Sequence, residues 1–242
     1  MFRIGIDEAG RGPVIGPLVV AGFRVPENDL SMLEEVGITD SKLLSLGQRN
    51  EIYEWLHDNA EKRDWGIHVR HSNPGEIDNA MALTNLNEHE VSLFSSVARN
   101  LQTGGGGILQ LDACDTDANR FGNNVASRLE SWPWDGWSMD SRHGADLDFL
   151  AVGAASIIAK VNRDRAIEGI KEDIGIDFGS GYPSDPKTIA SIEELISGES
   201  PHDCLRWGWA TVRNAWMSKY GTDVPKRPVD GDIPPNPQRT LF

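Results

Sequence analysis

Two strand-like segments follow each other near the start of the chain, before any helical pattern begins. Residues 3–9, RIGIDEA, alternate and then end on charged residues, and residues 13–25, PVIGPLVVAGFRV, are rich in β-branched residues. Only a tight turn separates the two segments. Strands joined so closely pair antiparallel, because a parallel connection needs a crossover of a dozen or more residues. A sheet that also receives later strands is therefore mixed rather than purely parallel.

The remainder of the chain alternates between helical and strand-like patterns, which indicates an α/β architecture. A helix is expected after Ser45, where Ile52, Trp55 and Leu56 share one face. Further strands are expected over 65–71 and 108–115, and further helices over 74–101, 117–131, the part of 148–175 that follows a small-residue turn, 188–198 and 203–219. Residues 221–242 hold five prolines and few apolar residues, so we expect an extended tail.

The formal net charge of −14 argues against indiscriminate binding to nucleic acid, although a local basic groove is compatible with it. An acidic surface also suits a high-salt cytoplasm, and composition leaves that environment open. No apolar run approaches a membrane span, and no basic and hydrophobic leader is visible after Met1. Cys114 and Cys204 lack metal-type spacing and are expected to be free thiols in a reducing compartment. We therefore expect a cytoplasmic monomer.

Four carboxylates occupy positions that suit a metal site. Asp7 and Glu8 end one expected strand, Asp112 ends another, and Asp146 stands just before the small-residue turn into a helix. Strand ends of an α/β sheet converge on one rim, where carboxylates can hold hard divalent cations. Two such ions about 3.5–4 Å apart would stabilise the entering and leaving oxygens of phosphoryl transfer.

Other interpretations of these acidic residues remain open at this point. The chain has 37 acidic residues, and most of them must lie on the solvated surface. The Asp7-Glu8 pair could equally be a strand end that meets solvent. Asp115, Asp117 and Asp148 compete for the roles given to Asp112 and Asp146, and spacing does not decide among them.

Gly10-Arg11-Gly12 lies three residues beyond Asp7. Glycines allow backbone N–H groups to approach phosphate or sugar oxygens without an intervening Cβ. A tight turn between two strands explains these glycines equally well. The sequence is not a dinucleotide fingerprint, because the third spaced glycine and the following helix are missing.

Several later residues could contact phosphate or a sugar. Lys42 lies near a helix start, and Ser156, Lys160 and Arg163 recur at helical spacing on one face. These charges could also form ordinary surface ion pairs. Tyr182 lies between glycine and proline in GSGYPSDPKT, where a rigidly held aromatic ring can stack on a sugar or base, or fill a surface hollow.

Five motifs occur together in this order along the chain: GIDEAGRGPVIGPLVVA, DSK, LDACD, HGAD followed by AASIIAKVNRDR, and GSGYPSDPKT. Over roughly residues 3–190 they resemble ribonuclease HII. The likeness is greatest to its archaeal branch, because of DANRFG and the SGYPSDP form. Each motif is moderately specific, and the ordered set is very specific.

The resemblance implies an RNase H-like fold, with a mixed five-stranded sheet flanked by helices and a helical C-terminal extension. It implies a catalytic domain over 1–187, a helical part over 188–220 and a Pro-rich tail over 221–242. It further implies cleavage of the RNA strand of RNA–DNA hybrids and incision 5′ of ribonucleotides embedded in duplex DNA. Two Mg²⁺ or Mn²⁺ ions would assist this hydrolysis, which would leave 3′-OH and 5′-phosphate ends.

The resemblance also assigns roles to individual residues of this chain. Asp7, Glu8, Asp112 and Asp146 match the family's four acidic metal ligands. Gly10, Arg11 and Gly12 match the loop that senses the ribose 2′-OH, the group that distinguishes RNA from DNA at one residue. Tyr182 matches the tyrosine against the sugar on the DNA side of the junction, and Lys42, Lys160 and Arg163 match phosphate contacts.

Two features of the sequence around Asp146 remain: a local departure from the family pattern and a nearby histidine. Phe149-Leu150 and Gly153 stand where the family often has Tyr-Pro and Ser, so the backbone after Asp146 is expected to differ locally. His143 is near Asp146 in sequence and could shuttle protons, but a surface histidine explains it better, since no partner is visible.

The last residues, NPQRTLF, resemble a truncated sliding-clamp peptide. Gln238, Leu241 and Phe242 match part of that pattern, although the paired aromatics are incomplete, and an arbitrary terminus is the alternative. Two rival functions also remain: a non-catalytic hybrid-binding protein of the same fold, and a small-molecule phosphate enzyme. A duplex with a single ribonucleotide separates the three functions, since it would be cleaved, bound intact or ignored.

Overall fold

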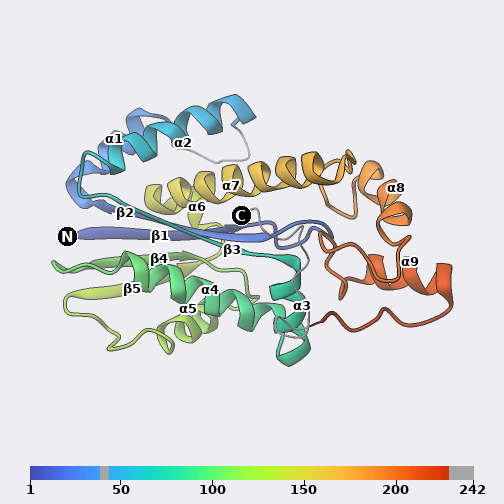
Figure 1. Cartoon of the computed structure of the whole chain (residues 1–242). Helices are drawn as coiled ribbons and strands as arrows, with labels where there is room; N and C mark the ends of the chain where they lie inside the picture. Colours follow the sequence, from blue (N-terminus) through green and yellow to red (C-terminus); the bar gives the residue numbers. More distant parts are fainter. Residues whose placement is uncertain (39–43, 229–242) are drawn as a thin grey trace.

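The computed structural model describes residues 1–38 and 44–228 and contains a mixed five-stranded sheet with helices on both faces (Figure 1). The strands are β1 (Phe2–Ala9), β2 (Leu18–Pro26), β3 (Gly66–Ser72), β4 (Gly107–Asp112) and β5 (Trp137–Arg142). They lie in the order β3-β2-β1-β4-β5. β2 is antiparallel to both β1 and β3, whereas β4 is parallel to β1 and β5. The predicted mixed sheet and its antiparallel opening pair are thus confirmed.

A short 3₁₀ helix, Glu27–Asp29, follows β2, and α-helices account for most of the remaining regular structure. The α-helices are α1 (Leu30–Glu35), α2 (Leu46–Ala60), α3 (Pro74–Leu83), α4 (Leu86–Leu101), α5 (Ala118–Ala126), α6 (Ala145–Asp148), α7 (Leu150–Ile174), α8 (Pro186–Leu195) and α9 (Ala210–Tyr220). None of the helices in the described ranges combines the length and apolar character that a membrane crossing requires.

Some predicted boundaries were wrong. The predicted helix over 74–101 is two helices, because Thr84 leaves the helical conformation and the Asn85 side chain caps α4 by accepting the Glu88 N–H at 3.0 Å. The predicted small-residue turn is the first part of α7, which begins at Leu150. The predicted strand over 13–25 begins only at Leu18.

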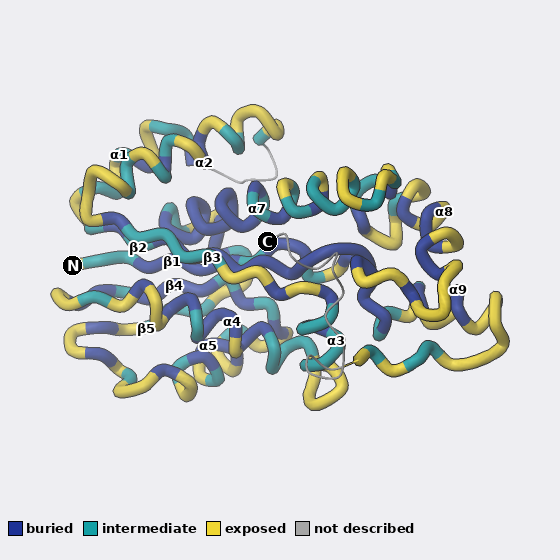
Figure 2. The backbone as a smooth tube through the Cα atoms, in the orientation of Figure 1, coloured by how far each residue is buried: buried dark blue, intermediate teal, exposed yellow. Residues whose placement is uncertain are grey.

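The two faces of the sheet bury different sets of side chains. α7, with α1 and α2, covers one face, and α4 and α5 cover the other (Figure 1). Because side chains alternate along a strand, Ile4 and Ile6 of β1 join the α4 side, whereas Ala9 joins the α7 side. Buried residues concentrate in the central strands and the first half of α7 (Figure 2).

α7 packs against β1 at backbone distance. A Cβ placed on Gly5 would lie 2.1 Å from the carbonyl carbon of Ala151, so only glycine fits this position of β1. The small residues at the start of α7, which the sequence predicted as a turn, therefore allow the helix to approach the sheet closely. This approach carries the α7 side chains directly over the end of β1.

A third core lies at the far end of α7 and contains the C-terminal helices. Its buried members include Ile15, Ile167, Leu205 and Trp216. Ile15 and Leu205 also form an isolated β-bridge, so the segment after α8 runs along the β1–β2 connection. The domain boundary predicted at 187/188 falls within α8, and the division of the chain into domains stays a prediction.

Gly169→Ala is expected to stabilise the protein. Gly169 lies inside α7, and a Cβ at this position would have no heavy atom within 4 Å. Glycine in a helix interior costs roughly 0.5–1 kcal/mol relative to alanine, so we expect a gain of about that size in the free energy of unfolding. Urea unfolding followed by circular dichroism measures it. A loss of stability would show that α7 is not continuous through this position.

Candidate active site

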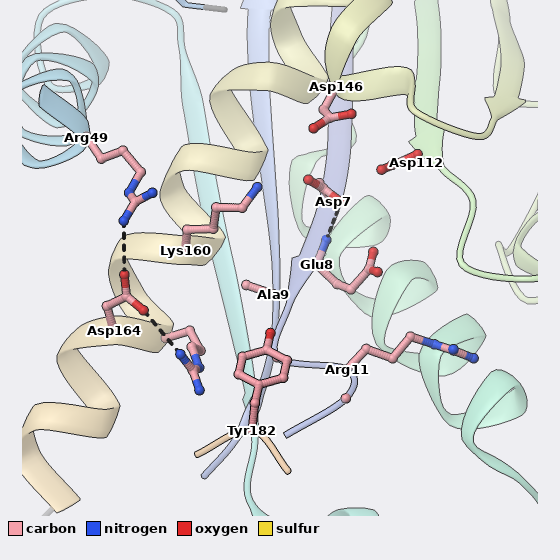
Figure 3. A pocket seen from close by; sticks show the side chains of 13 residues that line it. Asp7, Glu8, Ala9, Arg11, Arg49, Asp112, Asp146, Lys160, Asp164 and Tyr182 are labelled. Carbon is pink, nitrogen blue, oxygen red and sulfur yellow. Dashed lines mark hydrogen bonds and ion pairs between the residues drawn. The ribbon is translucent and has the colours of Figure 1, made fainter. Parts of the chain in front are cut away.

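A pocket of about 380 Å³ opens where β1 and β4 end (Figure 3). It brings together the tip of β1, the loop that follows it, and residues of α2, α6 and α7. The lining residues are Asp7, Glu8, Ala9, Gly10, Arg11, Gly12, Arg49, Asp112, Asp146, Lys160, Arg163, Asp164 and Tyr182. Nearly all the residues that the sequence singled out within the described ranges therefore meet in one place. Lys42, Gln238, Leu241 and Phe242 lie outside the described residues.

Three aspartates from three elements form the acidic centre of the pocket. Asp7, Asp112 and Asp146 each offer a carboxylate oxygen, and these oxygens lie within 4.8 Å of one another. Asp7 and Asp112 lie at the adjacent ends of β1 and β4, and Asp146 is buried in the short helix α6. The Asp112 carboxylate accepts the Ala145 N–H at 3.1 Å, so the end of β4 also holds the start of α6.

These carboxylates repel one another in the absence of a cation. Burial, followed by the charge of Asp112, raises the pKa of Asp7 to about 6. A hydrogen bond with Ser156 and the charge of Lys160 act in the opposite direction. A buried set of oxygen ligands that are hard to ionise together fits a divalent cation, because the ion supplies the missing positive charge.

Glu8 occupies the opposite side of β1 from Asp7. Successive strand residues point to opposite faces, so the Glu8 carboxylate lies with Glu90 of α4 and with Cys114, their ligand atoms within 4.8 Å of one another. Burial and the charge of Asp7 raise the pKa of Glu8 well above its usual range. The structure therefore brings three of the four predicted ligands together and places the fourth beside them, in a second acidic group.

The competing acidic residues have other partners. Asp115 forms a two-pronged ion pair with Arg120, and Asp117 caps α5 by accepting the Arg120 N–H. Asp148 is exposed and lies 3.6 Å from Arg142. His143 is exposed, and its ring nitrogen Nδ1 lies 3.1 Å from the Ala113 carbonyl oxygen. None of these four residues lines the described pocket.

The Gly-Arg-Gly loop turns sharply at Gly10. Gly10 has φ +86°, and a Cβ there would lie 2.6 Å from the Pro17 carbonyl oxygen, so this position requires glycine. The Arg11 side chain does not point at the aspartates: it turns toward α4 (Figure 3), where its Nε donates to Glu90 at 2.8 Å and its Nη2 donates to Asn87 at 2.7 Å. The loop therefore presents its backbone to the pocket while its side chain anchors it.

Cations and an aromatic ring line the other side of the pocket. Lys160 Nζ donates to Ser156 Oγ at 2.7 Å, one turn along α7, as the predicted spacing requires. The Arg163 guanidinium lies 5.2 Å from the Tyr182 ring centre and donates to the Ser180 carbonyl. Arg163 therefore holds the Tyr182 loop in place, and Tyr182 itself is 37% exposed beside Gly12.

Two residues of this region escaped the sequence analysis. Arg49 of α2 reaches the pocket and pairs with Asp164 at 3.6 Å, a contact that no local pattern reveals. Glu90 is fully buried and anchors Arg11. The sequence does contain a signal for Glu90. It lies four positions after Leu86 and four before Phe94, so a charged residue stands on the apolar face of its helix.

Adding Mg²⁺ or Mn²⁺ is expected to raise the melting temperature of the protein. A cation that binds only the folded state at a hundred times its Kd stabilises it by about 2.7 kcal/mol, or roughly 5–10 °C for a chain of this size. Differential scanning fluorimetry with and without EDTA measures the shift, with NaCl of equal ionic strength as the control. An equal shift in Asp112→Asn would place the binding elsewhere.

Comparison with known proteins places the chain in a family. The family model described as ribonuclease HII matches residues 4–212. The chain is 38% identical to ribonuclease HII of Methanosarcina barkeri over 220 residues, which cover 88% of this chain and 95% of the relative.

Two solved structures of archaeal proteins are similar over most of the chain. Ribonuclease H2 of Pyrococcus horikoshii superposes with a TM-score of 0.79 at 36% identity, covering 90% of this chain and 98% of the other. The protein in the PCNA:RNase HII complex of Archaeoglobus fulgidus has a TM-score of 0.74 at 38% identity, covering 86% and 95%. The chain therefore belongs to the ribonuclease HII family, endonucleases of the type 2 ribonuclease H class that cleave the RNA strand of RNA–DNA hybrids.

Proposed function

We propose that this chain is a divalent-metal-dependent endonuclease that incises duplex DNA 5′ of an embedded ribonucleotide, as well as RNA–DNA hybrids. One observation carries the proposal: three aspartates from separate elements converge within 4.8 Å, in the same pocket as the Gly-Arg-Gly loop and Tyr182. The rival phosphate enzyme lacks support, because no helix N-terminus follows the glycine turn, which leads into the connection to β2.

Asp7, Asp112 and Asp146 would hold Mg²⁺ or Mn²⁺, with Glu8 beside them. Bound there, such ions would supply activation of a water and stabilisation of the charge that develops on the phosphate oxygens, and the products would carry 3′-OH and 5′-phosphate ends. The chain's own residues position the substrate. Lys160 extends its ammonium group toward the carboxylates and balances part of their charge.

The loop and Tyr182 would select the nucleotide to be cut. Backbone groups of Gly10, Arg11 and Gly12 border the pocket beside the aspartates and can hydrogen-bond to a ribose 2′-OH without reading the base. The exposed face of Tyr182, braced by Arg163, offers a platform for the sugar of the next nucleotide. Arg49, Lys160 and Arg163 supply positive charge for the neighbouring phosphates, and Lys42 is proposed to do the same.

A labelled duplex with one ribonucleotide tests the proposal. In Mg²⁺ or Mn²⁺ we expect one cut on the 5′ side of the ribonucleotide and none in an all-DNA control, at low and at molar salt. A retarded but uncut duplex in a gel-shift assay would favour the hybrid-binding rival. A duplex that is neither cut nor bound would contradict both.

We further propose that the tail binds the sliding clamp through Gln238, Leu241 and Phe242. Support comes from the solved complex of the Archaeoglobus fulgidus relative with PCNA and from the partial match of the last residues to a clamp peptide. A Pro-rich segment with few apolar residues suits tethering, since such a tether lets the enzyme move while it remains bound. Clamp capture by the full chain, lost when residues 236–242 are deleted, would support this. Equal capture without the tail would contradict it.

A further inference from the structure

A fully buried arginine lies beneath the Gly-Arg-Gly loop and takes no part in the pocket. Arg206 stands just before α9 and has no exposed surface. Its guanidinium donates to the carbonyl oxygens of Gly10 at 2.5 Å, Arg11 at 2.9 Å and Gly16 at 3.0 Å. Among the described residues, the Arg206 guanidinium thus donates to main-chain oxygens and to no carboxylate.

Trp209 completes this contact from the same segment. Its ring centre lies 4.9 Å from the Arg206 guanidinium, and its Nε1–H donates to the Gly12 carbonyl oxygen at 3.3 Å. The carbonyls of all three loop residues therefore accept hydrogen bonds from residues 206–209. An isolated buried cation is costly, so these acceptors and the aromatic face must offset its desolvation.

Fixing a carbonyl also fixes the N–H group of the following residue. In a trans peptide the C=O and the next N–H lie in one plane and point in opposite directions. Holding the Gly10 and Arg11 carbonyls against Arg206 therefore turns the N–H groups of Arg11 and Gly12 to the other side of the loop. The loop lines the pocket and Arg206 does not, so that other side is the pocket side.

We propose that Arg206 and Trp209 are positioning residues that set the preference for a ribonucleotide. Arg206 aims the Arg11 and Gly12 N–H groups at the ribose 2′-OH, and Trp209 holds Gly12 and the Arg206 guanidinium in place. The inference rests on the proposed function. It assigns to the C-terminal segment a part in selectivity, although neither residue lines the pocket described above.

Arg206→Lys and Trp209→Phe test this, with Arg227→Lys as the matched control. Lysine keeps the charge of Arg206 but cannot reach three carbonyls at once, and phenylalanine keeps the ring but removes the indole donor. Arg227 is a half-buried arginine that stacks on Trp207, pairs with Asp78 and Asp203 and donates to the Leu205 carbonyl, so it supports the same segment without touching the loop.

Two readouts are combined. The first is the ratio of affinities for a single-ribonucleotide duplex and an all-DNA duplex, measured in a cleavage-deficient Asp112→Asn background. We expect Arg206→Lys to lower this ratio about tenfold, the worth of one lost hydrogen bond to the 2′-OH, and Trp209→Phe to lower it about threefold. The second is amide hydrogen exchange of residues 8–17, which should quicken in both variants and stay unchanged in Arg227→Lys.

The possible outcomes distinguish a failure of the proposed function from a failure of the role given to Arg206 and Trp209. A parent protein that shows no preference for the ribonucleotide would overturn the proposed function and this inference with it. A parent that discriminates, with both loop variants discriminating equally well, would overturn the inference alone. If Arg206→Lys fails to fold, Trp209→Phe decides the matter, because it leaves the buried cation in place.

Discussion

Asp112→Asn is expected to lower the single-turnover cleavage rate by about a thousandfold or more while the fold stays intact. The substitution removes one of three converging negative charges, and a loss of that size corresponds to roughly 4 kcal/mol of transition-state stabilisation. Asparagine still offers an oxygen to the Ala145 N–H, so α6 keeps its attachment to β4. Asp7→Asn and Asp146→Asn are expected to behave alike.

Asp148→Asn is the matched control for this prediction. Asp148 stands two residues from Asp146 in the same short helix, but it is exposed and faces Arg142. We expect the cleavage rate of Asp148→Asn to stay within about twofold of the parent rate, because an exposed ion pair contributes little to stability. Cleavage of the single-ribonucleotide duplex measures both variants, and circular dichroism confirms folding. Equal losses in Asp146→Asn and Asp148→Asn would refute the assignment of the acidic centre.

Gly5→Ala is expected to cause the largest loss of stability. The added methyl carbon would lie 2.1–2.3 Å from main-chain atoms of Ala151 and Val152, and main-chain atoms of a long helix cannot move aside as a flexible side chain can. Overpacking of this kind costs about 3 kcal/mol or more, which lowers the melting temperature by roughly 6–12 °C. Thermal and urea unfolding measure the effect.

Gly169→Ala provides the comparison, since it adds the same methyl group to α7 where space is open. The two substitutions should therefore shift stability in opposite directions. Because β1 carries Asp7 and α7 carries Lys160, Gly5→Ala should also slow cleavage below its melting temperature. A melting temperature within about 1 °C of the parent would show that β1 and α7 are not in backbone contact.

The sequence predicted elements well where apolar residues follow a clear period. β1 was found because apolar and other residues alternate along it, although its central residues are all buried. The helix after Ser45 was found because Ile52 and Leu56 recur at helical spacing after a serine that suits a helix start. β5 escaped the residue pattern, because WSMDSR has one buried side chain and lies at the sheet edge, where little periodicity is required. α1 escaped as well, since only Leu33 within it is buried.

The site was predictable to the extent that it depends on strand ends. Strand ends made Asp7 and Asp112 candidates, but the family resemblance was needed to prefer Asp112 over Asp115 and Asp117, and Asp146 over Asp148. The division of Asp7 and Glu8 between two faces follows from strand alternation and could have been derived from the sequence. The contact of Arg206 with Gly10 spans 196 residues, and no local pattern encodes such a pairing.

The 196 positions between Gly10 and Arg206 affect the order in which the loop and its partners appear during synthesis. The loop at the start of the chain receives its carbonyl partners from residues that are translated 196 positions later. At about 5–20 residues per second, a ribosome takes roughly 10–40 s to make the intervening segment. The first strands can pair during that interval, and Arg11 can reach Glu90, but the carbonyls of the Gly-Arg-Gly loop gain Arg206 only when most of the chain has been made. The three aspartates of the acidic centre are therefore all translated before the residues that hold the carbonyls of this loop.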